Sequence, residues 1–180
     1  MKAAWLPHQV MSMNSREKAR EAALKKLGSR ARTEKEIRDH LRSLDFSTED
    51  VNDAVDFLRE YNYINDERYC RQYYAYARPK GKALYRIIRE LEQKGIPAHV
   101  ARTALEDMEA EPEFGEEVIS DRDAALEVGF KMARQQSASG KDFDQKFLAR
   151  IGRRLAGLGY DSSTCYYVMN KVKDYGKEDE

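Results

Sequence analysis

An internal repeat is the feature of this 180-residue sequence that most limits the folds it can adopt. Three stretches of 19 residues share one apolar pattern. Each stretch begins with Ile, has Leu four residues after this Ile and an apolar residue five residues after this Leu, and has another apolar residue after a short break. The equivalent residues are Ile37, Leu41, Phe46 and Val51; Ile87, Leu91, Ile96 and Val100; and Ile151, Leu155, Tyr160 and Cys165. Apolar residues four apart share one face of an α-helix, so each stretch predicts two helices joined by a short turn.

Helix-start signals occur where this pattern expects helices to begin. Thr33 with Glu36 forms a capping box, and Ser47, Pro97 and Asp161 or Ser162 stand at the breaks. A further helix precedes each pair, at about residues 15–27, 66–77 and 121–135. The sequence therefore predicts an all-α fold of three tandem three-helix, helix-turn-helix-like repeats. They span residues 15–64, 65–109 and 121–173, with a flexible N-terminus at 1–14, an acidic linker at 110–120 and an acidic tail at 174–180.

The charges are balanced overall but segregated along the chain. There are 32 basic and 32 acidic residues, and charged residues make up 36% of the sequence. Residues 68–89 contain seven Lys or Arg and five Tyr but no carboxylate, whereas residues 106–123 contain nine acidic residues and one Arg. Residues 128–173 are again basic, with nine basic and three acidic residues. Such blocks create local fields that the net charge conceals, and they favour an anionic partner, either nucleic acid or an acidic protein surface.

Helical periodicity predicts which of these side chains face outward. On the helix at residues 66–77, Tyr69, Tyr73 and Tyr76 share the face expected to enter the core, and Tyr74 lies on an opposite, exposed cationic stripe. The next helix is expected to bury its apolar face and to present its basic residues outward, with no neighbouring carboxylate in the sequence to neutralise them. The third repeat repeats this arrangement. The candidate binding residues are Arg68, Arg71, Tyr74, Arg78, Lys80, Lys82, Arg86, Arg89, Lys146, Arg150, Arg153 and Arg154.

No recognised catalytic or metal-binding pattern is present in the sequence. The three His residues are isolated, and no Walker, GxSxG, HExxH or kinase motif occurs. Cys70 and Cys165 form no CxxC pair and are expected to be reduced, with Cys70 buried as a structural residue. No apolar run approaches about 20 residues. We therefore expect a cytoplasmic non-enzyme without cofactor, catalytic residue, metal site or membrane partner. The acidic stretch at residues 106–123 is interpreted as a solvated loop or as an intramolecular counterweight to the basic faces.

Longer segments of the first two repeats resemble one bacterial family. The segment YINDERYCRQYYAYAR at residues 63–78, followed by RIIRELEQKGI at residues 86–96, resembles the signature of the RecX proteins. The preceding segment ARTEKEIRDHLRSLDFSTEDVNDAVDFLREYNYI also fits, and in the third repeat the likeness depends mainly on GRRLAGLGY.

This resemblance implies an elongated, curved, all-helical monomer without catalytic residues. RecX proteins lie in the groove of the RecA recombinase filament on single-stranded DNA, which they contact directly or through the filament. They restrain its growth, ATP hydrolysis, strand exchange and coprotease activity, and so modulate DNA repair, recombination and the SOS response. The resemblance also implies that the basic stripes named above correspond to the family's positive concave surface.

Two other functions remain open from the residues alone. One is a helix-turn-helix regulator that reads duplex sequence, although the second helix of each pair is poor in base-reading Arg, Asn and Gln. The other is a helical-repeat adaptor whose basic stripes meet acidic protein, where Tyr and Arg are frequent anchors.

Overall fold

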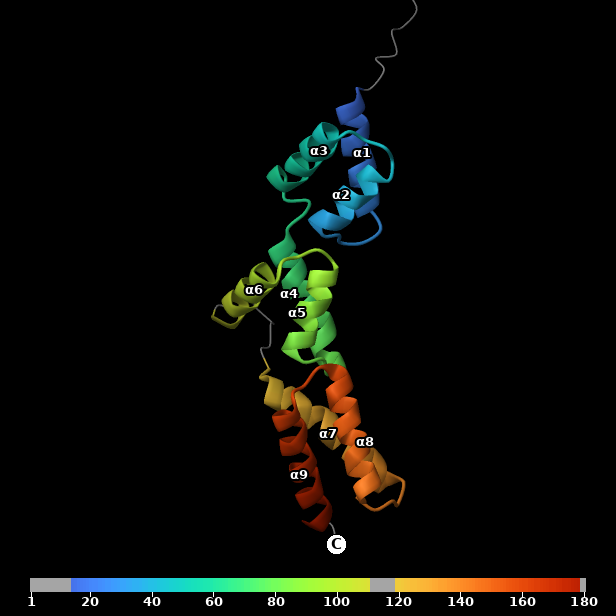
Figure 1. The fold of residues 1–180 in the computed structure, drawn as a ribbon, viewed down its shortest axis with the longest axis vertical. Coiled ribbons are helices and arrows are strands. Elements are labelled where there is room, and N and C mark those ends of the chain that lie inside the picture. The colour runs from blue at the N-terminus through green and yellow to red at the C-terminus, as the bar shows by residue number, and fades with distance from the viewer. Residues whose placement is uncertain (1–13, 111–118, 179–180) are drawn as a thin grey trace, which may run out of the picture. The chain divides into compact units, whose positions relative to one another are not determined.

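The computed structural model describes residues 14–110 and 119–178, which are helical apart from short turns (Figure 1). In these residues there are nine α-helices and one 3₁₀ turn, and no β-strand. The elements are α1 (Ser15–Leu27), α2 (Glu34–Arg42), α3 (Thr48–Glu60), α4 (Asp66–Ala77), η1 (Arg78–Lys80), α5 (Leu84–Gln93), α6 (Ala98–Ala110), α7 (Asp121–Ala138), α8 (Gln145–Leu158) and α9 (Ser162–Glu178). The prediction of an all-α fold is confirmed. Residues 1–13, 111–118 and 179–180 lie outside the described part, and with them most of the expected N-terminal segment and acidic linker.

The chain divides into two compact units, Met1–Asn65 and Asp66–Glu180, of which the first contains α1 to α3. These three helices pack against one another around a small aliphatic core. Ile37, Leu41 and Leu58 have no exposed surface. The helix α1 contributes Ala19 and Ala23, which are also fully buried. Their small side chains allow α1 to approach α3 closely.

The second unit contains two further three-helix clusters. In one, α4, α5 and α6 surround Ile87, Leu91 and Ile96, and in the other α7, α8 and α9 surround Ile151, Leu155 and other apolar residues. Backbone contacts join the two clusters within this unit. The Ala83 amide donates to the Leu158 carbonyl at 3.0 Å, so that the start of α5 lies against the end of α8. The three-helix repeats are confirmed as clusters, whereas their exact borders stay a prediction.

The repeat extends to the backbone hydrogen bonds that end its central helix. The amides of Phe46, Ile96 and Tyr160 donate to the carbonyls of Leu41, Leu91 and Leu155 at 3.4, 3.1 and 3.2 Å. In each case the preceding residue has a positive φ, at 60° for Asp45, 90° for Gly95 and 96° for Gly159. This combination is a Schellman motif, which reverses the chain after the helix and brings an apolar residue back over its last turn. The same local chemistry therefore sets the same turn in all three repeats.

Most of the predicted helix starts are confirmed. Thr33 and Glu36 form the full capping box at the start of α2, and the Ser47 side chain accepts a bond from the Asp50 amide. Asp161 accepts a bond from the Thr164 amide at 2.7 Å, which selects it over its neighbour as the cap of α9. Pro97 lies immediately before α6 rather than at its first residue.

Candidate binding surface

The helix α4 turns a different face to the core than its sequence pattern predicts. Cys70, Tyr74 and Ala77 are buried, with exposed fractions of 0%, 5% and 0%. Tyr76, which was expected inside, is 58% exposed, and Tyr69 and Tyr73 are half-buried. The predicted exposure of Tyr74 is wrong because its side chain belongs to the core formed by α4, α5 and α6, and this removes Tyr74 from the residues available to a partner.

Arg78 is also buried, contrary to the prediction that it lies on an exposed stripe. Its guanidinium donates to Asp121 Oδ1 at 2.5 Å, to the Lys82 carbonyl at 3.0 Å, and to the Ile119 carbonyl. The Leu84 amide also donates to Asp121 Oδ1, at 3.0 Å. Arg78 is therefore enclosed where the end of α4 meets the start of α7, and its charge is compensated within the protein. It holds the two clusters of the second unit together instead of facing a ligand.

Arg86 and Arg89 lie on the outward face of α5, as its periodicity predicts, and Lys82 lies just before this helix. This face is not free of carboxylates. Glu90 accepts bonds from Lys82 at 2.7 Å and from Arg86 at 3.2 Å. Partial burial alone would raise the pKa of Glu90, but hydrogen bonds from Lys82, Tyr73 and Arg86 outweigh it and hold this pKa below its usual value. Arg89 also lies 3.6 Å from a carboxylate oxygen of Glu92. The prediction that these cations lack a neutralising neighbour is therefore wrong for Lys82, Arg86 and Arg89.

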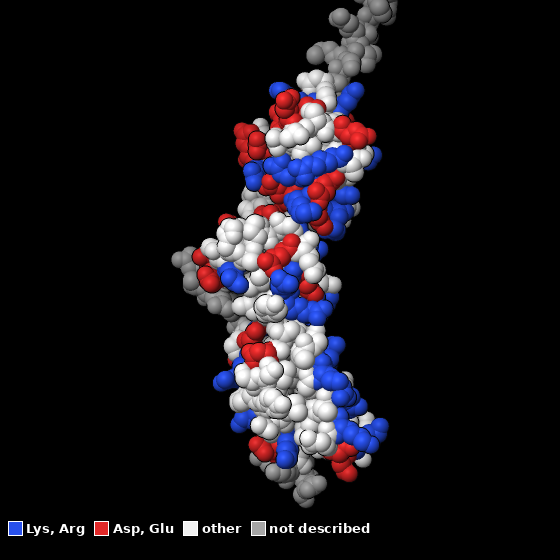
Figure 2. All heavy atoms as spheres, in the orientation of Figure 1, with Lys and Arg blue, Asp and Glu red and all other residues white. Residues whose placement is uncertain are grey.

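The outward face of α8 carries four exposed basic side chains and no acidic one. The helix contains no Asp or Glu, and Lys146, Arg150, Arg153 and Arg154 recur on one side of it. Arg150 donates to the amide oxygen of Gln136, which leaves its charge uncompensated. Figure 2 shows these basic side chains along the right-hand edge of the α8 region. We call Lys146, Arg150, Arg153 and Arg154 the α8 basic stripe.

Arg86 connects this stripe to α5. Its guanidinium donates to the Gly157 carbonyl in the last turn of α8, and its Cβ lies close to Gly159. The basic side chains of α5 and α8 therefore adjoin at the junction of the two clusters. A polyanion lying on this surface would meet cations from both helices.

The predicted site omitted a row of aromatic rings beside these cations. Tyr69, Tyr73 and Tyr76 lie along α4 with neighbouring ring centroids 6.4 and 6.1 Å apart. Lys80 Nζ lies 3.2 Å from the Tyr76 centroid, and Lys94 Nζ lies 6.0 and 5.7 Å from the other two. We call Tyr69, Tyr73 and Tyr76 the α4 tyrosine row. Its spacing was visible in the sequence but was interpreted as a core face. Of the other candidates on this helix, Arg68 is exposed and Arg71 is half-buried.

Comparisons with known proteins give the family. Models of the first and the second three-helix domains of RecX match residues 19–58 and 65–105. The regulatory protein RecX of Corynebacterium efficiens is 32% identical over 164 residues, which cover 89% of this chain and 74% of that protein. The chain belongs to the RecX family.

More distant RecX proteins agree with this assignment. The regulatory protein RecX of Clostridium perfringens strain 13 is 27% identical over 161 residues, covering 86% of this chain and 68% of that protein. The crystal structure of RecX from Lactobacillus salivarius has the same fold, with a TM-score of 0.69 at 23% identity over 88% of this chain and 97% of that one. The resemblance inferred from the sequence is confirmed.

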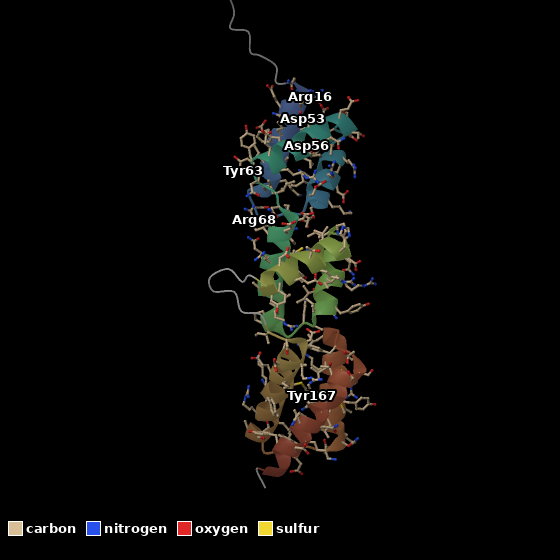
Figure 3. All side chains as sticks on the ribbon, turned by 90° about the vertical axis from the view of Figure 1, so that its left-hand side faces the viewer. Arg16, Asp53, Asp56, Tyr63, Arg68 and Tyr167 are labelled. Atoms are coloured by element: carbon tan, nitrogen blue, oxygen red, sulfur yellow. The ribbon has the colours of Figure 1, made fainter. Side chains whose placement is uncertain are left out.

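In this RecX-family chain, the first unit has a surface of the opposite sign. Glu49, Asp53, Asp56 and Glu60 recur at helical spacing on the outward face of α3. Figure 3 shows Asp53 and Asp56 on this helix, turned toward the viewer. Only Asp53 has a close bidentate partner, in Arg20 at 2.7 and 3.0 Å. This face would repel a phosphate backbone.

Other chemistry is sparse in the part of the chain that the structure describes. No group of three or more His, Cys, Asp or Glu side chains is placed to hold a metal ion among these residues. Within the same residues, no helix is long and apolar enough to cross a membrane. Both cysteines are free and buried, and burial raises the pKa of the Cys70 thiol to about 12. The expected structural role of Cys70 fits this environment, because the thiolate form is strongly disfavoured.

Proposed function

We propose that this protein binds the RecA recombinase filament on single-stranded DNA and restrains its recombinase, ATPase and coprotease activities. Through this restraint it would modulate DNA repair, recombination and the SOS response. The observation that carries the proposal is the α8 basic stripe on a member of the RecX family. Its four cations face solvent with no carboxylate on the same helix.

The arrangement suits a contact with a nucleoprotein filament. A strand of nucleic acid binds Lys and Arg mainly through its phosphates, whatever its base sequence. The cations of α8 and α5 adjoin at Arg86, so one strand can contact both clusters of the second unit. In this proposal the protein bridges neighbouring recombinase protomers and holds the DNA. Such bridging opposes the movements that accompany ATP turnover, and no chemical step is required of the protein itself.

ATP hydrolysis by RecA on circular single-stranded DNA tests the proposal. We expect the wild-type protein to slow hydrolysis, and the Arg153→Ala/Arg154→Ala variant to do so only at several-fold higher concentration. The matched control is Lys131→Ala/Arg134→Ala, which removes two exposed charges from α7 in the same cluster. Equal losses in the two variants would attribute the effect to net charge and not to α8. An unchanged hydrolysis rate with both substoichiometric and stoichiometric wild-type protein would refute the proposal.

The salt dependence of binding separates this proposal from a protein adaptor. Two lost phosphate contacts reduce the slope of log K against log salt by about 1.4 for a single strand. An adaptor that meets only acidic protein would show no steep salt-dependent binding to oligonucleotides. The acidic outward face of α3 disfavours a helix-turn-helix regulator that recognises duplex sequence. In such a regulator the corresponding face of the recognition helix would contact phosphates and base edges.

The proposal places the protein in the cytoplasm, where it acts as a monomer and contacts single-stranded DNA directly or through the filament. Co-sedimentation with RecA filaments, beside RecA alone and naked DNA alone, identifies which component supplies the affinity. Sedimentation equilibrium of the free protein measures its oligomeric state.

A further inference from the structure

The α4 tyrosine row is a surface feature as well as a partner of the core. Tyr69 and Tyr73 are stacked with ring planes 8° apart, and Tyr76 continues the row with a tilt of 42°. Tyr69 and Tyr73 pack one side against the core of α4, α5 and α6, whereas Tyr76 is outside that core and 58% exposed. The row therefore offers aromatic surface to solvent over two turns of helix.

Positive charge surrounds these rings. Lys80 and Lys94 bring their ammonium groups over the row, and Lys82 Nζ lies 5.9 Å from the Tyr73 centroid. Glu90 is the carboxylate that contacts Tyr73, and it is already bonded to Lys82 and Arg86. Three ammonium groups thus approach the rings of the row, whereas the carboxylate in contact with them is that of Glu90. An uncharged or cationic protein segment would not be attracted by these ammonium groups. An anionic chain that also carries planar ring groups would be attracted by the ammonium groups and could stack on the exposed Tyr rings.

The middle ring is fixed before any partner arrives. The Tyr73 hydroxyl donates to Glu90 Oε2 at 2.7 Å, so its ring orientation is set by α5. Burial, together with this hydrogen bond to a carboxylate, raises the pKa of Tyr73, and the hydroxyl stays neutral at physiological pH. A fixed ring loses little conformational freedom when another flat group stacks on the row.

We propose that the α4 tyrosine row is a stacking site for the bases of single-stranded nucleic acid, with Lys80 binding a flanking phosphate. This inference rests on the proposed function, since it names the side chains of that surface that meet the bases. Every base has a π-face, so stacking on Tyr rings beside cations binds single strands without reading their sequence. Tyr76 is the principal contact because it is the most exposed ring of the row.

The test compares an oligonucleotide that has bases with one that lacks them. Fluorescence anisotropy measures the binding of labelled dT15 and of an abasic strand of the same length to the full-length protein. Three variants are compared with wild type: Tyr76→Ala, which removes the ring; Tyr76→Phe, which keeps it; and Tyr166→Ala. Tyr166 is 66% exposed on α9 in the same unit and is the matched control.

We expect wild type to prefer dT15 over the abasic strand, and Tyr76→Ala to weaken dT15 binding by about 5-fold or more. Binding of the abasic strand should change less than about 2-fold, since phosphate contacts do not depend on the ring. Tyr76→Phe and Tyr166→Ala should behave as wild type. No preference in wild type, no effect of Tyr76→Ala, or failure of Phe to restore the preference would each overturn the stacking site.

A second measurement needs no variant. Irradiation of a 5-iodouracil oligonucleotide bound to the wild-type protein crosslinks stacked aromatic side chains, and peptide mapping locates them. Crosslinks at the α4 tyrosine row support the inference, and crosslinks confined to other segments overturn it. The proposed function is measured separately by RecA ATP hydrolysis. A preference for dT15 over the abasic strand, without inhibition of RecA ATP hydrolysis, would refute the proposed function and support the stacking site. Inhibition of RecA ATP hydrolysis without this preference would support the proposed function and refute the stacking site.

Discussion

Replacing Arg78 by Ala is expected to destabilise the second unit by about 3 kcal/mol. The guanidinium is buried and makes three hydrogen bonds, two to the carbonyls of Lys82 and Ile119 and one to Asp121. Loss of the donor to each carbonyl costs about 1 kcal/mol. The ion pair contributes about 1 kcal/mol more, discounted because the Asp121 side chain is 41% exposed and regains water. The sum lies at the low end of about 3–5 kcal/mol for breaking a buried pair.

Two companion variants separate charge from geometry. Asp121→Asn keeps an oxygen that accepts from Arg78 and from the Leu84 amide, so only the ionic part is lost, about 1 kcal/mol. Arg78→Lys keeps the charge but lacks the planar fork that reaches several acceptors at once. We expect stability to fall in the order wild type, Asp121→Asn, Arg78→Lys, Arg78→Ala.

Urea unfolding followed by circular dichroism gives the total loss, and hydrogen exchange gives its location. Because the chain has two compact units, a single two-state transition is not assumed, and exchange at the starts of α5 and α7 is the decisive signal. Faster exchange there, with unchanged exchange in α1 to α3, is expected for Arg78→Ala. A loss below about 1 kcal/mol, or faster exchange spread evenly over both units, would refute the role given to Arg78.

Three further outcomes follow from the same contacts. Gly159→Ala should lower the free energy of unfolding by more than 1 kcal/mol, because φ is 96° at this residue and an added Cβ would lie 2.7 Å from the Cβ of Arg86. Gly157 has open space around it, so Gly157→Ala should leave this free energy unchanged or raise it by about 0.5–1 kcal/mol. Urea unfolding compares the two variants. The pKa of Glu90 is lower in the folded state than its ordinary value of 4.5. Ionised Glu90 therefore stabilises the fold fully above pH 4.5, and this stabilisation is lost as the pH falls through the lower, folded-state pKa. In the Glu90→Gln variant, the free energy of unfolding should depend less on pH in that acidic range. Cys70, with its pKa raised to about 12, should react with a thiol reagent only after unfolding, which time courses with and without urea would show.

The fold was predictable because its signals are local and occur three times. The side chains of Ile37, Ile87 and Ile151 have no exposed surface, and neither do those of the Leu residues four positions later. Helix starts depend on side chains within three residues of the amides that they cap. Each of these signals is contained within one repeat, so no knowledge of distant contacts was needed to interpret them.

The surface was predictable only in part, because it depends on contacts between distant segments. The pattern of α4 offers two triplets with the same spacing, and packing against α5 and α6 selects the face that contains Tyr74. Arg78 is buried by Asp121, which lies 43 residues away in the sequence. In contrast, the pairing of Arg86 with Glu90 is at i, i+4, so this neutralisation was visible in the sequence and was overlooked.

The central helices of the three repeats share a backbone plan but differ in how their cations are compensated. On α2, Arg38 pairs with Glu34 at 2.6 Å, and Arg42 pairs with Asp39 at 3.6 Å. On α5, Glu90 pairs with Arg86 and with Lys82, which lies just before the helix, and Glu92 pairs with Arg89 at 3.6 Å. On α8 there is no carboxylate at all. Since these outward side chains lie outside the buried cores, their charge is able to vary among the repeats. Of these three central helices, α8 therefore carries the most uncompensated positive charge, and it is the one that attracts an anion most strongly.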